Sequence, residues 1–303
     1  MNDKITTIID QQKCTGCGLC LEVCPDQTIS LEEGKAVVSG SNCLQCGHCA
    51  AVCPTEAIEV KAIDLANLKY NNFGPVDKWL AWGKFDTAEL VRLMASRRSC
   101  RNYQDREISR DTLNDLVKIG ITAPSGTNCQ KWTFTVLDRR DQVKKLGSRI
   151  ALFFHKLNRM SENPLLRLMS RLFGGNTLGT YYHSYYESVK RGLIEWEEEE
   201  RDLLFHGAPA VILVGSEPGA SCPAEDALLA TQNILLGAHS MGLGSCPIGF
   251  AVSAIQSEPA IKDIIDIPRE EKIYSVIALG YPNENYQRFT GRLTPVVRFP
   301  EMS

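Results

Sequence analysis

Alternating apolar and polar positions predict both helices and strands in the larger, C-terminal part of the chain. Residues 132–137 alternate threonines with apolar side chains, a period-two pattern that predicts a strand. The short apolar runs 209–214 and 273–279 are typical of buried strands. Between these two runs, residues 225–241 are long enough for a helix, and Gly242 stands where glycine commonly ends one.

Two earlier helices are indicated by their first residues. Asp86 and Glu89 form a D-x-x-E capping box, and the apolar residues that follow share one helical face: Leu90, Leu93 and Met94. A second helix is expected to begin near Ser109 and to end before Pro124. Its buried face would carry Leu113, Leu116 and Val117. Residues 151–205 give no comparably clear pattern.

The N-terminal part of the chain has a different composition and a different hydrophobic pattern. Residues 1–62 are interrupted by Cys, Gly and Pro, and only the short runs 4–9 and 57–60 favour strands. Residues 63–85 have the character of a connector with amphipathic pieces. We therefore predict three parts: a small domain at 1–62, a connector at 63–85 and a larger domain at 86–303.

Composition and charge narrow the class of protein. The 303 residues are 44% apolar and 23% charged with a net charge of −3, which suits a globular chain and favours neither nucleic acid nor membrane as partner. The charge is uneven: residues 1–60 sum to −5 and the remainder to about +2, which suits binding of an anionic cofactor. The chain has no secretory pattern and no apolar run of 18 residues, so we expect a cytoplasmic location.

Eight cysteines in the first 60 residues carry the strongest chemical signal. The first block is C-x2-C-x2-C-x3-C-P, from Cys14 to Pro25, and the second repeats it from Cys43 to Pro54. A [4Fe–4S] cubane needs four thiolates from different directions; each tight run supplies three, and the cysteine before proline reaches across to the other cluster. We therefore assign Cys14, Cys17, Cys20 and Cys53 to one cluster and Cys43, Cys46, Cys49 and Cys24 to the other.

The alternative for these cysteines is a pair of zinc sites. Zinc sites usually use paired C-x2-C knuckles and not two runs of four that each end in proline. The segment resembles bacterial two-cluster ferredoxins along its whole length. Its acidic charge and the cluster type indicate low reduction potentials.

Four further segments suggest a flavin. Arg97-Arg98-Ser99 offers forked donors for a phosphate, although a basic helix end is also often merely solvated. Residues 123–132 are rich in short hydrogen-bonding side chains, which suits a uracil-like ring edge or a plain polar loop. Glycines within 242–250 indicate close backbone approach to a flat ligand. The segment 278–282 is followed by Arg288 and Arg292.

In this order and spacing the four segments resemble the nitroreductase family of FMN enzymes over residues 86–303, and the whole chain resembles the ferredoxin–nitroreductase fusions of anaerobes. The resemblance implies an α+β sheet wrapped by helices, built as a homodimer with FMN at its interface. It implies phosphate and ribityl contacts from Arg97, Arg98 and Ser99, with Arg292 returning to the phosphate. It places Arg101 near the N1/O2 edge of the flavin. It also implies ring and ribityl contacts from Ser125, Asn128 and Gln130, and backbone at the N5/O4 side from Pro247, Ile248 and Gly249.

The function that follows is electron transfer from two [4Fe–4S] clusters to FMN and on to an electrophilic small molecule such as a nitroaromatic or a quinone. Reduced ferredoxin or flavodoxin would be the donor. The chain departs from some family members by lacking a Glu after Ile248, so the resemblance does not predict nicotinamide binding. An alternative function is that of a carrier that delivers electrons to a partner protein, and a redox sensor is a third hypothesis. FMN would perform the chemistry, so no side-chain nucleophile is expected.

Overall fold

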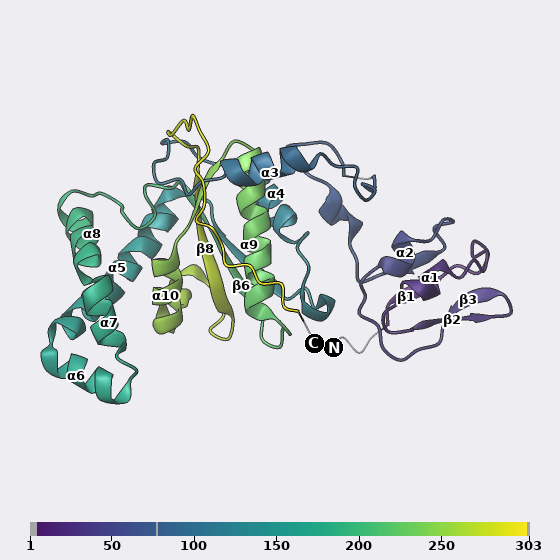
Figure 1. Cartoon of the computed structure of the whole chain (residues 1–303), viewed down its shortest axis with the longest axis horizontal. Helices are drawn as coiled ribbons and strands as arrows, with labels where there is room; N and C mark the ends of the chain where they lie inside the picture. Colours follow the sequence, from purple (N-terminus) through teal and green to yellow (C-terminus); the bar gives the residue numbers. More distant parts are fainter. Residues whose placement is uncertain (1–4, 77, 302–303) are drawn as a thin grey trace.

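The computed structural model describes residues 5–76 and 78–301. Lys4, the first residue of the strand predicted at 4–9, lies outside the described residues. Figure 1 shows a small cysteine-rich unit at one end of the molecule and a larger unit, built around a four-stranded sheet, beside it. Among the described residues, no helix combines the length and the apolar character needed to cross a bilayer.

The cysteine-rich unit consists of two similar halves. Its elements are β1 (Thr7–Ile9), α1 (Leu19–Glu22), β2 (Ile29–Glu32), β3 (Lys35–Val38), α2 (His48–Ala51) and β4 (Ile58–Val60). Strands β1 and β4 pair antiparallel, and β2 and β3 form a hairpin. Each short helix begins after a glycine with left-handed φ, 80° at Gly18 and 74° at Gly47. Side chains other than glycine rarely adopt this backbone, so these glycines let each cysteine loop turn into its helix.

The connector between the units is tied to the larger one. It contains a 3-10 turn, η1 (Leu65–Leu68), and then passes over α4 (Arg110–Gly120). The carboxylate of Asp115, which is 0% exposed, accepts hydrogen bonds from the backbone and side-chain nitrogens of Asn71 and Asn72. Lys118 Nζ also donates to the carbonyl of Lys69, at 2.7 Å. The connector therefore has a fixed attachment to the larger unit.

The larger unit is a mixed helical and sheet structure. Its remaining helices are α3 (Thr87–Ser96), α5 (Arg140–Glu162), α6 (Pro164–Phe173), α7 (Thr177–Ser184), α8 (Tyr186–Glu198), α9 (Pro223–Ser240) and α10 (Gly249–Ser257), with the 3-10 segments η2 (Gly126–Asn128) and η3 (Pro259–Ile265). Its strands are β5 (Trp132–Leu137), β6 (Ala210–Ser216), β7 (Gly244–Pro247) and β8 (Lys272–Gly280). They pair antiparallel in the order β5-β6-β8-β7.

The two faces of the sheet bury two separate cores. Alternate residues of β6 point to opposite sides: Ile212 packs in the core covered by α4 and α9, and Leu213 in the core covered by α5 and α10. Both are 0% exposed, because a central strand covered on both faces excludes water from each side. In Figure 1, α9 and α10 lie on either side of the sheet.

Most elements predicted from periodicity are present. The strand expected at 132–137 is confirmed, as are the helix capped by Asp86 and the one that begins after Ser109. The apolar face predicted for α3 is largely uncovered within one chain, since Leu90 and Met94 are 37% and 44% exposed. The prediction missed β7, α10 and the four helices that fill residues 140–198. This helical group forms the lobe at the far left of Figure 1.

Candidate functional site

The eight predicted cluster ligands lie around two separate cavities. One cavity is lined by the thiols of Cys14, Cys17, Cys20 and Cys53, and the other by those of Cys24, Cys43, Cys46 and Cys49. The division is the crossed one that the sequence predicts, with the fourth cysteine of each block contributed to the other set. Burial raises the pKa of Cys49 to about 11, and the thiols that act on it electrostatically are those of the same set, Cys46, Cys24 and Cys43.

These two cavities fit clusters better than single ions. Among the described residues, no three His, Cys, Asp or Glu side chains approach closely enough to share one metal ion. A cubane spreads its thiolates over four iron atoms and so holds them further apart than one tetrahedral zinc ion does. Four thiols line each cavity, and although Asp26 and His48 also line the Cys43 cavity, a set of four thiolates suits iron–sulfur chemistry.

Backbone N–H groups point at the sulfurs of both sets. Ala36 N donates to Cys14 Sγ at 3.4 Å and Ala57 N to Cys53 Sγ at 3.2 Å. In the other half, Thr28 N donates to Cys24 Sγ at 3.2 Å. Hydrogen bonds to ligand sulfurs stabilise their negative charge and thereby tune a cluster's potential. The fold thus provides the surroundings that an iron–sulfur cluster uses.

A cluster of arginines lies where α3 ends. Burial lowers the pKa of Arg97, and the neighbouring guanidinium groups of Arg98 and Arg292 lower it further. Nη1 of Arg97 is buried and, within the described part of the chain, has no hydrogen-bond partner. A buried donor without a partner is costly, and like charges repel one another. An anion between these arginines would relieve both costs, so the residues fit a phosphate.

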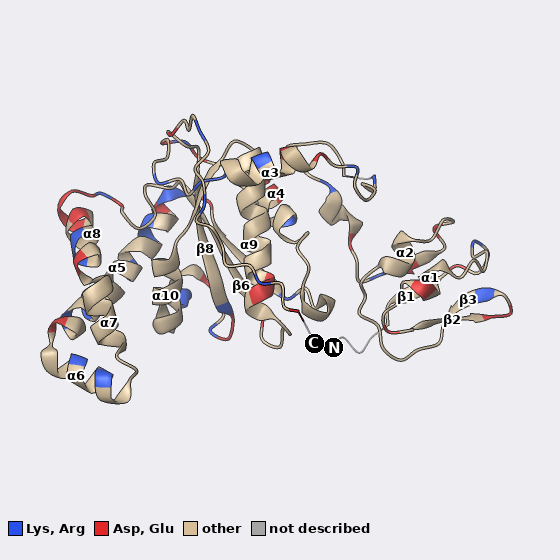
Figure 2. Cartoon of the chain, viewed as in Figure 1, with Lys and Arg blue, Asp and Glu red and all other residues tan. Residues whose placement is uncertain are grey.

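The segment that follows the arginines is fastened to the sheet. Ser99 forms a bridge to Ser245 on β7, and Cys100 N donates to the carbonyl of Ser245 at 3.0 Å. A Cβ added to Gly244 would come within 2.7 Å of Cys100 Cβ, so only glycine permits this approach. Two sequence segments almost 150 residues apart are thereby brought together. Figure 2 shows basic ribbon, in blue, near the upper end of β8 where they meet.

A large cavity opens beside this junction. Its volume is about 790 Å³, and its wall includes Arg101, Cys246 and the predicted backbone segment Pro247, Ile248 and Gly249. Aromatic side chains from the helical lobe, Tyr181 and Tyr185, form another part of the wall. Four of the predicted flavin contacts therefore surround one cavity, which is wide enough for a flat ring system.

The predicted contacts Ser125, Asn128 and Gln130 lie elsewhere. Their loop leads into β5, whose first residue, Trp132, pairs with Ser216 at the last residue of β6. The arginine segment lies beside β7 and so at the opposite end, where β8 pairs with Ala210. The seven residues of β6 separate the two ends by about 20 Å. None of the three loop residues lines the large cavity.

The loop is held by other partners. Ser125 Oγ accepts from Gln130 N at 3.0 Å, which closes the loop on itself. Gly126 N donates to the buried carboxylate of Asp226, at 2.8 Å. The amide Nδ2 of Asn128 donates to the carbonyls of Leu44 and Gln45 in the cysteine-rich unit, at 2.9 and 3.1 Å. Asn128 thus contacts the loop between two predicted cluster ligands.

The comparison with protein families decides the assignment. The model of the nitroreductase family matches residues 94–281, and that of the 4Fe-4S dicluster domain matches residues 13–57. The chain belongs to the nitroreductase family. It is therefore an oxidoreductase that carries a ferredoxin-type iron–sulfur domain ahead of its nitroreductase domain.

Individual relatives agree with this assignment. A 4-nitrobenzoate reductase from Nocardioides sp. is 27% identical over 209 residues, which are 64% of this chain and 81% of the relative. An iodotyrosine deiodinase from Thermotoga neapolitana is 24% identical over 220 residues, 69% of this chain and 97% of the relative. Among solved structures, a nitroreductase with bound FMN from Bacteroides fragilis has the same fold, with a TM-score of 0.52 and 22% identity over 70% of this chain and 99% of that one.

Sequence reasoning did not assign His206 to the large cavity of the nitroreductase domain. His206 lines it, and its φ of 57° is in the left-handed region that non-glycine residues seldom occupy. Burial lowers the pKa of His206, and the charge of Arg101 acts in the same direction. No sequence motif surrounds His206; only its place after a buried aspartate, Asp202, which accepts from Phe205 N at 2.7 Å, could have indicated a structured turn.

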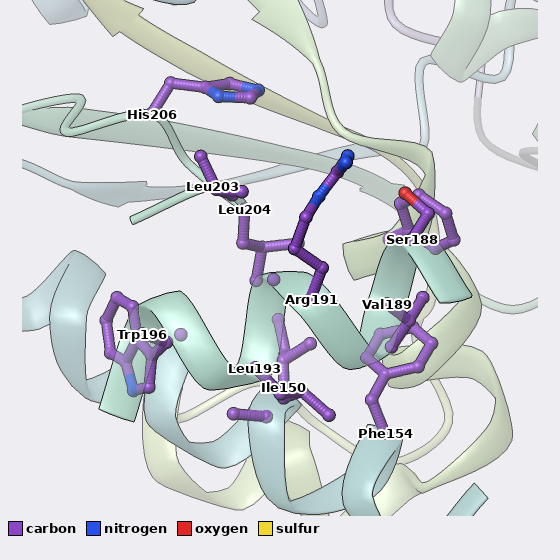
Figure 3. A pocket seen from close by; sticks show the side chains of 14 residues that line it. Ile150, Phe154, Ser188, Val189, Arg191, Leu193, Trp196, Leu203, Leu204 and His206 are labelled. Atoms are coloured by element: carbon purple, nitrogen blue, oxygen red, sulfur yellow. The ribbon is translucent and has the colours of Figure 1, made fainter. Parts of the chain in front are cut away.

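A second, smaller cavity of the nitroreductase domain adjoins the first. Its volume is about 230 Å³, and it shares Phe154, Leu203, Leu204, His206 and Phe250 with the large cavity. Figure 3 shows Ile150, Phe154 and Leu193 gathered at its base, with Arg191 extending toward His206. Together the two cavities offer an apolar space with a few polar groups, the usual character of a small-molecule site.

Proposed function

We propose that the chain passes electrons from two [4Fe–4S] clusters to FMN and then to a small electrophilic acceptor such as a nitroaromatic or a quinone. The observation that carries this proposal is the buried Nη1 of Arg97, which has no hydrogen-bond partner among the described residues. Arg98 and Arg292 lie close enough to lower the pKa of Arg97. Arg97 lies next to a cavity whose wall includes Arg101 and Gly249. A phosphate at one end of a flat cofactor and a ring at the other would satisfy both features.

The phosphate end would be held by Arg97, Arg98, Ser99 and Arg292. Guanidinium groups bind phosphate through parallel N–H donors, and such charge-assisted bonds are roughly twice as strong as neutral ones. The like charges of these arginines repel one another until an anion lies between them. Binding of the cofactor therefore stabilises an arrangement that is costly without it.

The ring end would lie against Pro247, Ile248 and Gly249 with Arg101 at its edge. Bound FMN converts electrons delivered singly into two-electron chemistry. Arg101 would provide a fixed positive charge at the ring edge where negative charge develops on reduction. Comparable fixed donors in a water-poor site contribute roughly 3 kcal/mol. The tyrosines and His206 of the cavity wall would exclude water and orient the acceptor.

The remaining predicted contacts, Ser125, Asn128 and Gln130, would come from a second copy of the chain. They lie at the opposite end of β6 from the arginines, so one chain supplies only half of the predicted site. Apolar side chains on α6 and the C-terminal segment are also exposed to solvent within one chain. They are Leu165, Leu168, Leu172, Phe173, Leu293, Val296 and Phe299. Apolar surface of this extent favours association, which supports a homodimer.

The acceptor would bind in the joined cavities. Their apolar walls suit a planar aromatic compound, and the relation to a 4-nitrobenzoate reductase supports the nitroaromatic class. A quinone is the parallel choice, because it accepts two electrons and two protons. Reduced ferredoxin or flavodoxin would supply electrons singly to the clusters.

A direct test is anaerobic turnover of the purified holoprotein with reduced ferredoxin as donor. We expect oxidation of the reduced flavin by nitroaromatics or quinones, with saturation in acceptor concentration. If these compounds leave the reduced flavin untouched while an oxidised partner protein reoxidises it quickly, the chain is an electron carrier instead. The exposed thiol of Cys17 in the cysteine-rich unit is the feature that would favour that second function.

A further inference from the structure

The cysteine-rich unit contacts the nitroreductase domain at the loop between Cys43 and Cys46. Leu44 and Gln45, whose carbonyls accept from Asn128 Nδ2, lie between Cys43 and Cys46 and line the same cavity as those cysteines. The sulfurs of this set are therefore next to the loop that the sequence assigns to the flavin. Asn128 joins the two by side-chain hydrogen bonds of 2.9 and 3.1 Å.

The other cysteine set faces away. Ala36 of the β2–β3 hairpin lines the cavity of Cys14 and donates to its sulfur, at 3.4 Å. Figure 1 shows this hairpin at the end of the molecule furthest from the four-stranded sheet. Cys17 of this set is exposed, whereas Cys43 and Cys46 are partly covered. Cys14 and Cys20 are buried, but Cys17 is the one exposed cysteine of the eight, so an external donor can approach the Cys14 set most directly at this residue.

The cysteine-rich unit is attached to the nitroreductase domain of its own chain. Only eight residues separate β4 from Lys69, whose carbonyl accepts from Lys118 on α4. The next anchor follows at once, where Asp115 accepts from Asn71 and Asn72. This short, doubly tied connector keeps each cysteine-rich unit beside the 125–130 loop of the same chain.

That loop, however, is the half of the flavin site that one chain cannot combine with its own arginines. The arginine segment and the loop lie at opposite ends of β6, about 20 Å apart. A flavin that meets residues 125–130 of one chain is then held by Arg97 and Arg292 of the partner subunit. The cysteine-rich unit and the flavin's phosphate clamp must in that case belong to different chains.

We propose that electrons enter at the Cys14 set, leave from the Cys43 set and cross to the flavin that the partner subunit's Arg97 and Arg292 hold. The inference rests on the proposed function. Each transfer takes one electron from a reduced cluster, which returns to its oxidised form. Two transfers and one proton from water give the two-electron-reduced flavin anion. The reductant is a low-potential one-electron donor of the ferredoxin class.

Mixed dimers test this route. One chain carries Cys46→Ser, and the other carries Arg97→Met with Arg292→Ala; two affinity tags isolate the mixed species. Its one intact flavin site has arginines from the first chain and lies beside the intact clusters of the second. We expect reduced ferredoxin to bleach the flavin absorbance at about half the wild-type amplitude per dimer. Failure of ferredoxin to reduce a flavin that dithionite still reduces would overturn the crossed route.

The reciprocal dimer provides the matched control. All three substitutions are placed on one chain, and its partner is wild type. The single flavin then has the wild-type chain's arginines but lies beside the damaged clusters, so ferredoxin should leave it oxidised. Bleaching in this dimer and none in the first would mean that electrons stay within one chain. Wild-type dimers that show no cluster-to-flavin transfer would instead refute the proposed function itself.

A second variant keeps the test decisive if Cys46→Ser prevents folding. Asn128→Asp replaces the Nδ2 donor by a carboxylate oxygen facing the carbonyls of Leu44 and Gln45. The repulsion should lower the docked population about tenfold, and the rate of flavin reduction with it. The rate at which ferredoxin bleaches the clusters should stay unchanged. Because Asn128 is also a predicted flavin contact, the rate of flavin reduction by dithionite is measured beside it, and a loss of equal size with both donors would mean that the substitution acts on the flavin site and would count against the route. An unaltered flavin reduction rate in protein with full cluster and flavin content would exclude this contact from the route.

Discussion

Replacing Arg97 by methionine should change flavin affinity and the stability of the flavin-free protein in opposite directions. The guanidinium Nη1 of Arg97 is buried and, among the described residues, has no hydrogen-bond partner. Methionine keeps much of the apolar stem and removes the charge and the donors. The flavin-free protein then loses a costly group, whereas the flavin-bound protein loses a phosphate contact.

The size of both effects follows from the energetics of hydrogen bonds. A hydrogen bond to a charged group contributes about 1.5–3 kcal/mol, so the Kd for FMN should rise about 10- to 150-fold. An unsatisfied buried donor costs about 1–3 kcal/mol. For a domain of this size, recovery of even about 1 kcal/mol should raise the Tm of the flavin-free protein by about 2–4 °C.

Fluorescence titration of FMN and thermal unfolding of flavin-free protein measure the two quantities. Arg92→Met is the matched control, because Arg92 lies on the same helix but its side chain is 63% exposed and pairs with Glu89 at 2.8 Å. This control should change neither quantity by much, since exposed ion pairs contribute little. Unchanged FMN affinity in Arg97→Met would remove Arg97 from the phosphate site. A lower Tm of its flavin-free form would mean that the guanidinium has a stabilising partner.

Three further outcomes are expected. Burial raises the pKa of Asp115, but the hydrogen bonds from Asn71 and Asn72 outweigh burial, so the pKa lies below its ordinary value. The ionised carboxylate therefore stabilises the folded protein at pH values above the pKa of the unfolded state. This stabilisation is lost as the pH falls through the pKa of the folded state. Limited proteolysis should therefore cut the connector of the wild type increasingly toward acid pH but that of Asp115→Asn at every pH, and equal pH dependence in both would contradict this attachment. Gly192 lines the smaller cavity, so Gly192→Leu should raise the KM for bulky aromatic acceptors about tenfold, a change of about 1.4 kcal/mol, and spare a small quinone; an unchanged KM for both acceptors would mean that neither binds in this cavity. Cys17→Ser should abolish ferredoxin-driven turnover while dithionite still supports reduction of the acceptor, and retained ferredoxin-driven turnover would rule out entry through the Cys14 set.

Local patterns predicted those features that depend on neighbouring residues. The alternation at 132–137 and the capping residue Asp86 were sufficient for β5 and α3. The crossed grouping of the cysteines also followed from local spacing, because three thiolates from one tight turn leave the fourth position to a distant residue. The structure places the eight thiols in those two groups.

Features that depend on tertiary packing were not predictable. Strand β7 has the sequence Gly-Ser-Cys-Pro, without branched or aromatic residues, and exists because β8 pairs with it. Helices α5 and α8 bury Ile150, Phe154 and Leu193 in one core, whereas α6 has no buried residue, and no single hydrophobic period predicts this arrangement. The left-handed backbone of His206 depends on its surroundings in the same way.

The placement of the predicted flavin contacts at two ends of the sheet is the largest of these differences. In the sequence, Arg97 and Asn128 stand 31 positions apart, and both match one family pattern. Strand pairing then directs them to opposite ends of β6. Neither the distance nor the contact of Asn128 with Leu44 is written in any local motif, because both depend on how the sheet is ordered and how the connector is tied.

The most direct test of the whole account is rapid anaerobic mixing of oxidised holoprotein with reduced ferredoxin while iron–sulfur and flavin absorbances are followed together. We predict that the broad iron–sulfur absorbance bleaches first and that the flavin band follows with a lag. A flavin that is reduced while the clusters remain oxidised, or a protein that contains no iron, sulfide or FMN when purified without oxygen, would contradict the account.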